Sequence, residues 1–334
     1  MSNILITGAS GFIGSFLVEH GIQAGHTIYA AIRKSSNTQY LKDKKIKTLY
    51  LNLSDKQAMV QNWNTIKKQI GSFEYVIHNA GISKALNKTE FDTTNYQYTI
   101  NLIESLSEAE MIPVKFIFIS SLAAYGPGDE KTLTPIKTTD TPAPITNYGI
   151  SKLKAEQYLF NQKRIPFIVF RPTGVYGPRD TDFHKYLKLL NNHIEVYTGG
   201  INQMLSFIYV KDLVTLIFRS LTSEISNKGY FVTDSKNYSS KQFALIIKEI
   251  LAKKTVRIVI PSFLVKLVAF ISEQTARLTN KASLLNLDKF KEITSRNWSC
   301  DSNETMTDFN FKSQYDLKIG LTETIKWYKE NGWL

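Results

Sequence analysis

A tyrosine and a lysine four residues apart, Tyr148 and Lys152, have the types and the spacing to move a proton. This spacing places both side chains on one face of the helix that we expect to begin near residue 147 and to end near residue 161. A free phenol has a pKa of about 10 and is a poor base at neutral pH. An ammonium group one turn away favours the phenolate and lowers that pKa. The pair could therefore exchange a proton with a substrate hydroxyl or carbonyl group; an ordinary exposed helical pair is the alternative.

Three glycines near the N-terminus predict a phosphate-binding turn. Gly8, Gly11 and Gly14 follow the apolar run 4–7 and precede an amphipathic run over 16–20. Strand, glycine turn and helix in that order are the context that such a site needs. The first glycine allows a tight turn, the second lets the backbone approach a pyrophosphate, and the third lets helix and strand pack closely. The helix N-terminus adds free N–H groups and positive dipole. We predict a bound dinucleotide; a glycine-rich turn without a ligand is the alternative.

Alternating strands and helices would position these residues. Strands are expected over 4–7, 27–32, 48–53, 75–78, 114–120 and 167–171, and helices over 55–70, 96–110 and 147–161. This alternation predicts an α/β fold with a Rossmann-type, doubly wound parallel sheet. Ligands of such sheets bind at the carboxyl ends of the strands. Gly8, Arg33, Asn79 and the pair Ser120-Ser121 fall at such ends, so we expect them to converge on one crevice.

The pattern loosens after the sixth strand and predicts a smaller α+β substrate-binding cap. We expect the sheet domain over 1–172, with a return of about 201–233 to it, and the cap over about 173–200 and 234–334. Within the cap, the run Phe263–Ile271 carries Lys266 and is far too short to span a bilayer. We interpret it as the core helix of the cap; a wall of the substrate pocket and a contact with a membrane surface are the alternatives.

Composition points to a soluble globular protein. The chain has 334 residues, of which 43% are apolar and 21% are charged, and a single cysteine, Cys300, that fits a reducing compartment. With no signal peptide at its start, we expect a cytoplasmic protein. The net charge of +12 includes nine basic residues between 33 and 68, against Asp43 and Asp55. No recognition helix or basic motif with interleaved aromatics accompanies them, so we expect a solvated basic face and no nucleic acid. We expect no metal site.

Two cations decide which cofactor is expected. Arg33 and Lys34 follow the second strand, where the adenosine ribose lies in a dinucleotide fold. An acidic residue there would bind the 2′-hydroxyl of NAD, whereas an arginine accommodates the 2′-phosphate of NADP. We therefore predict that NADP(H) is favoured over NAD(H). Loop cations without a ligand are the alternative.

The glycine turn with Tyr-x-x-x-Lys downstream resembles the extended short-chain dehydrogenase/reductase family, also called the NAD-dependent epimerase/dehydratase family. The resemblance covers essentially the whole chain. It includes the stretches 7–14, 78–81, 120–121, 125–126, 148–152, 171–178 and 207–212, together with Asn95. It implies a homodimer that pairs through the helices 96–110 and 148–161.

The resemblance also implies roles for single residues. Tyr148 would be the acid/base, Lys152 would tune it and hold the nicotinamide ribose, and Ser121 would hydrogen-bond the substrate oxygen. Asn95 would support this catalytic set. Cofactor contacts are expected from Gly8, Ser10, Gly11, Phe12, Ile13, Gly14, Arg33, Lys34, Asn52, Leu53, Asn79, Ala80, Gly81, Ser120, Tyr148, Lys152, Pro172, Thr173 and Val175.

Departures from the family pattern reduce the number of reactions that we expect. Sugar-nucleotide dehydratases carry an Asp-Glu pair beside the serine, but Leu122-Ala123 stands here and cannot do acid/base work. Nucleotide-sugar epimerases carry an arginine for the pyrophosphate just before the aromatic strand, where this chain has Leu205. They also carry an asparagine where this chain has Thr173-Gly174. Arg179 or Lys211 could substitute for the missing arginine.

The C-terminal half is similar to the 3β-hydroxysteroid dehydrogenase and dihydroflavonol reductase branch, which works on lipophilic or aromatic alcohols and ketones. Our leading hypothesis is an NAD(P)-dependent oxidoreductase that interconverts a secondary alcohol and a ketone or aldehyde, with a lipophilic small-molecule substrate. A nucleotide-sugar epimerase or reductase is the alternative. A non-catalytic dinucleotide sensor is a remoter one, against which the intact Ser121, Tyr148 and Lys152 weigh.

Overall fold

The computed structural model describes residues 1–199, 202–279 and 285–334, and its centre is a sheet of seven parallel strands. The strands are β1 (Asn3–Thr7), β2 (Thr27–Ile32), β3 (Lys47–Tyr50), β4 (Tyr75–His78), β5 (Lys115–Ile119), β6 (Phe167–Pro172) and β10 (Lys228–Val232), in the order β10-β6-β5-β4-β1-β2-β3. From β1, strands β2 and β3 follow in one direction along the sheet, and β4, β5, β6 and β10 follow in the other. Helices connect successive strands except β2 and β3, which a loop connects. The predicted doubly wound α/β fold is therefore confirmed.

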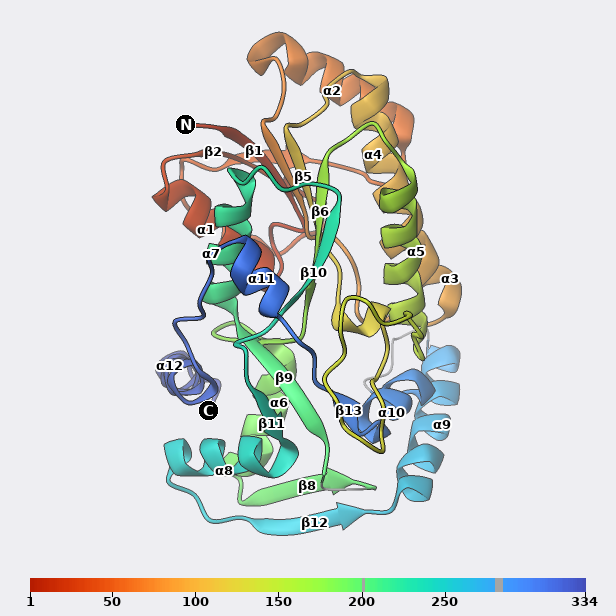
Figure 1. Cartoon of the computed structure of the whole chain (residues 1–334), viewed down its shortest axis with the longest axis vertical. Helices are drawn as coiled ribbons and strands as arrows, with labels where there is room; N and C mark the ends of the chain where they lie inside the picture. The colour runs from red at the N-terminus through yellow and green to blue at the C-terminus, as the bar shows by residue number, and fades with distance from the viewer. Residues whose placement is uncertain (200–201, 280–284) are drawn as a thin grey trace.

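Helices cover both faces of this sheet (Figure 1). On one face α1 (Phe12–Gln23) packs against α7 (Val210–Leu221). On the other lie α2 (Lys56–Ile70), α4 (Tyr98–Glu108) and α5 (Asn147–Asn161). Because successive strand residues point to opposite faces, Ile4 and Ile6 of β1 enter one core while Leu5 enters the other. Apolar runs such as 4–7 are buried from both sides for this reason.

Two boundaries differ from the sequence prediction. Strand β3 ends at Tyr50, so Asn52 and Leu53 lie in the loop beyond it. The helix expected over 96–110 is preceded by a short helix, α3 (Lys88–Phe91), and a π-helical turn over Asp92–Gln97. The chain runs from one into the next without a break, and the π-helical turn carries Asn95.

The second part of the chain is a smaller α+β assembly, as expected. Its strands are β7 (Gly174–Tyr176), β9 (Met204–Tyr209), β11 (Asn237–Ser239) and β13 (Asn297–Trp298) in one sheet, and β8 (Ile194–Thr198) with β12 (Val256–Ile260) in another. Its helices are α6 (Thr181–Asn191), α8 (Ser240–Leu251), α9 (Ser262–Thr279), α10 (Leu287–Thr294), α11 (Asn303–Asp308) and α12 (Leu317–Glu330). Strand β9 had been predicted over 205–210, whereas β7, β8, β10, β11, β12 and β13 had not been predicted as separate strands.

Within the range of about 201–233, for which a return to the sheet domain is predicted, β10 joins the main sheet and α7 packs against α1. Strand β9 lies in the same range but belongs to the smaller four-stranded sheet. Residues 200 and 201, where the predicted boundary falls, lie outside the described residues. The division into two domains stays a prediction.

The apolar run Phe263–Ile271 forms the first half of α9, and its interpretation as the core helix of the cap is wrong for most of its surface. Val265 and Ala269, one turn apart, are buried. The other large apolar side chains are between 41% and 55% exposed, or 70% for Phe263. The helix contributes a narrow stripe to the interior because few elements pack against it. Of the described helices, none has the length and apolar character that crossing a membrane requires.

Candidate active site

The glycine turn between β1 and α1 forms a cradle that side chains would fill. Gly8 has φ +64°, and a Cβ on it would lie 2.8 Å from the backbone N of Ala80. A Cβ on Gly14 would lie 2.0 Å from the Gly8 carbonyl oxygen. Helix α1 begins after Gly11 without a side-chain cap, so the N–H groups of its first turn face the turn unpaired. Phosphate oxygens are the partners that such a turn suits, and the residues present fit a dinucleotide.

The end of β4 closes on this turn and on the centre of the site. Asn79 Nδ2 donates to the Gly8 carbonyl at 3.4 Å. The position that a Cβ on Gly81 would occupy lies 3.2 Å from Lys152 Nζ and 2.9 Å from Asn95 Oδ1. A larger residue than glycine would therefore displace the lysine. The glycine turn, the end of β4 and the helix that carries Lys152 thus meet at one edge of the sheet, where the predicted residues Gly8, Asn79 and Lys152 lie close together.

Ser121 and Tyr148 face each other across this edge. Ser121 caps the short 3₁₀ turn Leu122–Ala124, and Tyr148 stands in the first turn of α5. Burial raises the pKa of the Tyr148 phenol to about 12, while a hydrogen bond with the Ser121 side chain lowers it in part and the charge of Glu292 adds to the rise. Without a further positive charge, the phenol is therefore protonated at neutral pH.

Lys152 lies one turn further along α5 and is 4% exposed. Its Nζ donates to the carbonyl oxygen of Ile119 at 2.9 Å. Desolvation lowers the pKa of this ammonium group to about 8, and the charge of Glu156 opposes that shift. The lysine is consequently held at the end of β5 and remains mostly charged at neutral pH.

Asn95 is fully buried, and its amide is used by the protein itself. Its Oδ1 accepts from the backbone N of Ile82 at 2.8 Å, and its Nδ2 donates to the Ile82 carbonyl at 2.9 Å and to Ser151 Oγ at 3.0 Å. Ser151 Oγ in turn donates to the Tyr148 carbonyl at 2.7 Å. Asn95 thus ties the loop after β4 to the first turn of α5, which makes it a positioning residue.

A buried ion pair that was not predicted from the sequence lies one helical turn from Lys152. Glu156 and Arg171 are 2% and 4% exposed, and their side chains approach to 2.8 Å. Ser120 donates its hydroxyl to Glu156, so this side chain points away from the crevice. The Ser120 hydroxyl is therefore occupied and is not available for the predicted cofactor contact. The four-residue spacing of Lys152 and Glu156 was the signal available in the sequence.

The residues predicted for the adenosine end lie apart from this centre. Arg33 and Lys34 are exposed just beyond β2. The backbone N of Arg33 donates to Ser36 Oγ at 3.0 Å and its carbonyl accepts from the backbone N of Ser36 at 3.0 Å, while its side chain has no partner among the described residues. Asn52 Oδ1 accepts from Ser54 Oγ at 2.8 Å, so the Asn52 side chain is already partnered. The backbone carbonyl of Leu53 accepts from Asn101 Nδ2 at 2.9 Å. The Arg33 guanidinium is left available to a ligand.

A cavity of about 760 Å³ opens beside Tyr148. Its sheet-side wall contains seven of the predicted residues: Phe12, Ile13, Ser121, Tyr148, Pro172, Thr173 and Val175. Its cap-side wall is mainly apolar and aromatic, with Phe183, Tyr186, Leu205, Phe207, Phe243, Ile293 and Trp298. The cavity joins the nicotinamide end of the predicted cofactor site to the cap.

The lysines that line this cavity are each paired with an acid. Lys84 and Lys185 pair with Asp182, and Lys289 pairs with Glu292 at 2.8 Å. The two cations considered as substitutes for the epimerase arginine lie elsewhere. Arg179 binds Glu19 at 2.7 Å and covers the rings of Phe16 and Tyr40, whereas Lys211 pairs with Glu323. Neither lines the cavity, whereas Leu205 does.

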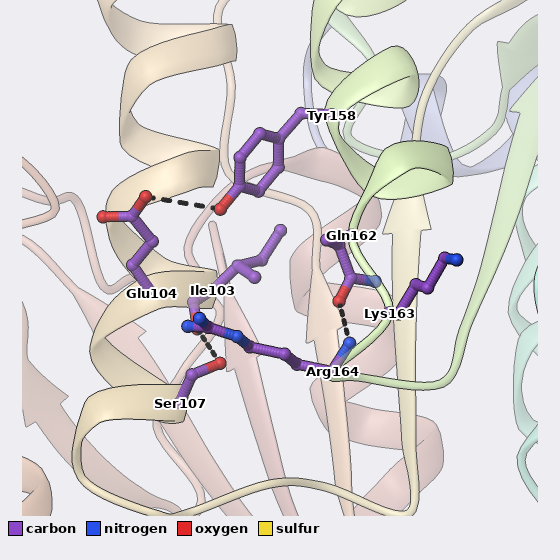
Figure 2. A pocket seen from close by; sticks show the side chains of 7 residues that line it. All are labelled: Ile103, Glu104, Ser107, Tyr158, Gln162, Lys163 and Arg164. Carbon is purple, nitrogen blue, oxygen red and sulfur yellow. Dashed lines mark hydrogen bonds between the residues drawn. The ribbon is translucent and has the colours of Figure 1, made fainter.

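A second, smaller hollow of about 270 Å³ lies between α4 and the end of α5 (Figure 2). Glu104 and Tyr158 face each other across it with a hydrogen bond of 3.4 Å. It shares no lining residue with the larger cavity. Among the described residues, no group of three or more His, Cys, Asp or Glu side chains could hold a metal ion.

Known proteins with similar sequences and folds include both epimerases and reductases. The sequence model of the NAD dependent epimerase/dehydratase family matches residues 4–232. The chain is 27% identical over 280 residues to the UDP-glucose 4-epimerase of Vibrio cholerae, covering 79% of this chain and 80% of that protein. It is 23% identical over 340 residues to the ceramide reductase of Caulobacter vibrioides, covering 99% of this chain and 96% of that protein.

The fold has also been seen in solved structures. The crystal structure of the UDP-glucose 4-epimerase of Thermotoga maritima with UDP-glucose matches with a TM-score of 0.79 at 20% identity, covering 98% of this chain and 99% of that one. At this identity the likeness shows the fold alone. It extends over the main sheet and the cap together.

Proposed function

The chain belongs to the NAD dependent epimerase/dehydratase family, and from this premise we propose that it is an NAD(P)-dependent oxidoreductase that interconverts a secondary alcohol and a ketone. The observation that carries the proposal is the cavity itself. Tyr148 and Ser121 stand at its sheet-side wall, and the facing cap wall is mainly apolar and aromatic, with Lys185 and Lys289 held by their acid partners. An acid/base group opposite such a wall suits a lipophilic substrate.

Proton transfer falls to Tyr148. In the direction of carbonyl reduction, its phenol gives a proton to the substrate oxygen while the Ser121 hydroxyl hydrogen-bonds the same oxygen and stabilises its developing negative charge. The Lys152 ammonium, with a pKa of about 8, supplies the positive charge that favours the phenolate left behind. The hydride itself would come from the bound nicotinamide cofactor.

A nicotinamide dinucleotide is the cofactor of the family, and we propose that this chain favours NADP(H). Arg33 supports the preference, because its exposed guanidinium stands just beyond β2 with no side-chain partner among the described residues. A guanidinium fork binds a phosphate in two places, which a ribose hydroxyl cannot match.

A second candidate function is nucleotide-sugar epimerisation. The relative from Vibrio cholerae carries that activity in its name. Lys84, Lys185 and Lys289 line the cavity and could turn from their acids toward a diphosphate. Two observations disfavour epimerisation. All three lysines are paired with acids, and the apolar Leu205 stands where epimerases carry an arginine. The ceramide reductase of Caulobacter vibrioides bears a name that fits the first proposal.

The test is turnover with a panel of lipophilic ketones and alcohols, followed by the absorbance of the reduced cofactor, for the wild type and for Tyr148→Phe. We expect the substitution to lower kcat by about 10²- to 10⁴-fold while NADPH binding is retained. Tyr158→Phe is the matched control, since this tyrosine stands on the same helix but outside the cavity. It should leave kcat unchanged.

Other outcomes would select the alternatives. Conversion of a nucleotide sugar to its epimer, with no net change in the cofactor, would overturn the alcohol/ketone proposal. If the wild type bound NADPH tightly but turned over neither class of substrate, the sensor hypothesis would replace it.

A further inference from the structure

Nine large apolar side chains are exposed together at one end of the molecule. They lie on β12 and on the first half of α9, which follow each other in the chain, and Figure 1 shows both elements at the lower end. We call them the apolar cap surface: Val256, Ile258, Val259, Phe263, Leu264, Leu267, Val268, Phe270 and Ile271. Single exposed apolar residues are ordinary, but a contiguous group marks an interaction site.

The spacing of residues along α9 shows that the exposed apolar side chains lie on the side of the helix that faces away from the cap. Val265 and Ala269 face the interior of the cap. Phe263, Leu267 and Phe270 follow the spacing i, i+4, i+7 and so share the opposite side of α9. A helix that is apolar on both sides is normally buried on both. The outer side of α9 therefore lacks a partner among the described residues.

The charged residues within the segment that carries this surface are all basic. The stretch 253–272 contains Lys253, Lys254, Arg257 and Lys266 and no aspartate or glutamate. Arg257 lies 3.6 Å from Glu195, but the three lysines make no ion pair with any described residue. Cations at the margin of an apolar face match a lipid surface, where anionic headgroups lie above hydrocarbon.

The same surface adjoins the substrate cavity. Strand β12 pairs with β8, with Ile258 opposite Val196 and Val259 opposite Tyr197. Val196 and Tyr197 line the cavity. Helix α9 contacts α10, which supplies Glu292 and Ile293 to the cavity wall. Strand β8 and helix α10 thus lie between the apolar cap surface and the cavity.

We propose that the apolar cap surface docks on the surface of an anionic lipid bilayer. Phe263, Leu267 and Phe270 enter the boundary between headgroups and acyl chains, and the three free lysines bind anionic headgroups. This inference rests on the proposed function in one respect: a lipophilic substrate dissolved in the bilayer would then reach the cavity through the adjoining cap.

The first test is flotation of the full chain with vesicles of phosphatidylcholine, with and without phosphatidylglycerol. We expect the wild type to float with the anionic vesicles and much less with neutral ones. Lys253→Glu/Lys254→Glu/Lys266→Glu should lower the partition coefficient by more than about 100-fold, since each basic residue near such a surface contributes about fivefold. Phe263→Gln/Leu267→Gln/Phe270→Gln should lower it by at least about tenfold.

Matched controls separate docking from loss of folding. Ile319 on α12 is 54% exposed and lies outside the apolar cap surface, so Ile319→Gln should float like the wild type. Circular dichroism and NADPH binding should be the same for all variants. The inference is overturned if the wild type does not float with anionic vesicles, or if both triple variants float as well as it does.

A second copy of the chain is the competing occupant. Sedimentation velocity without vesicles decides this: if the apolar triple substitution alone reduced the oligomeric state of the wild type, the surface would be a protein interface and the proposal would be wrong. Flotation requires no turnover, so its failure leaves the alcohol/ketone proposal standing. Conversely, absence of turnover on water-soluble ketones without vesicles would count against the proposed function alone.

Discussion

Lys152 and Glu156 lie one turn apart on α5, both almost completely buried. The Glu156 charge opposes the desolvation that lowers the pKa of Lys152, and the pKa that results is about 8. Glu156 is itself fixed by Arg171 Nε at 2.9 Å and by the Ser120 hydroxyl. The centre of the site therefore rests on a buried charge network and not on the Tyr148–Lys152 pair alone. Buried ion pairs hold their geometry because breaking them leaves an uncompensated charge.

Glu156→Gln tests this relationship through the pH dependence of carbonyl reduction. The negative charge of Glu156 favours the ammonium form, so its removal lowers the pKa of Lys152 below about 8. The ammonium is then lost at a lower pH, and the alkaline limb of the kcat/KM profile should move toward acid. Glu104→Gln removes an exposed charge from the neighbouring helix and should leave the profile in place.

The same substitution leaves Arg171 without its partner and should reduce the free energy of unfolding by about 3–5 kcal/mol. Chemical denaturation measures that loss, and the pH profile is recorded only where the variant is folded. An unchanged alkaline limb in the folded variant would show that Glu156 has a purely structural role.

Gly14→Ala should abolish dinucleotide binding. The new Cβ would lie 2.0 Å from the Gly8 carbonyl oxygen, so α1 must move away from the turn that is predicted to hold the phosphates. Fluorescence titration with NADPH measures the loss. Gly25→Ala is the control, because a Cβ there meets nothing within 4 Å and only the positive φ is strained. Binding that survives in Gly14→Ala would place the phosphates elsewhere.

Arg33→Ala should raise the KM for NADPH by about 10- to 100-fold and leave the KM for NADH nearly unchanged. The expected size is that of a hydrogen bond between charged groups, about 1.5–3 kcal/mol. Lys44→Ala removes another exposed cation of the same basic face and should alter neither constant. Equal KM values for both cofactors in the wild type would refute the preference.

Asp212→Ala should destabilise the fold without changing cofactor binding. Asp212 is 2% exposed and accepts from the backbone N of Gln314 at 3.1 Å, from that of Tyr315 at 2.9 Å and from the Ser313 hydroxyl. Its removal leaves buried donors unpaired, so the free energy of unfolding should fall by about 3 kcal/mol. Urea denaturation measures this, with exposed Asp43→Ala as the control. A loss below that of the control would show that water replaces the carboxylate.

The part of the molecule that depends on local spacing could be predicted from the sequence. Most of the parallel strands can be recognised as apolar runs, since a strand buried on both faces consists mainly of apolar residues. The turn over 8–14 and the helix that presents Tyr148 and Lys152 depend on neighbours within a few residues. Their relative position follows from the rule that carboxyl ends of parallel strands meet at one edge.

Only the tertiary structure decided the features that join distant segments. Glu156 reaches Ser120, 36 residues away, and Arg171, 15 residues away, so no local pattern marks these two partners. Whether a lysine at the cavity is free or paired depends equally on where an acid from another element comes to lie.

The run Phe263–Ile271 shows the same limit most clearly. Its apolar sequence determines that a helix there has an apolar face. It does not determine whether another element of the fold packs against that face and buries it. Burial is a sum of contacts with elements from elsewhere in the chain, and here those elements cover Val265 and Ala269 only. The sequence by itself determined the sheet, the glycine turn and the Tyr148–Lys152 pair, because each depends on spacing along the chain. The tertiary structure decided the charge network and the exposed surface, because each depends on what folds against it.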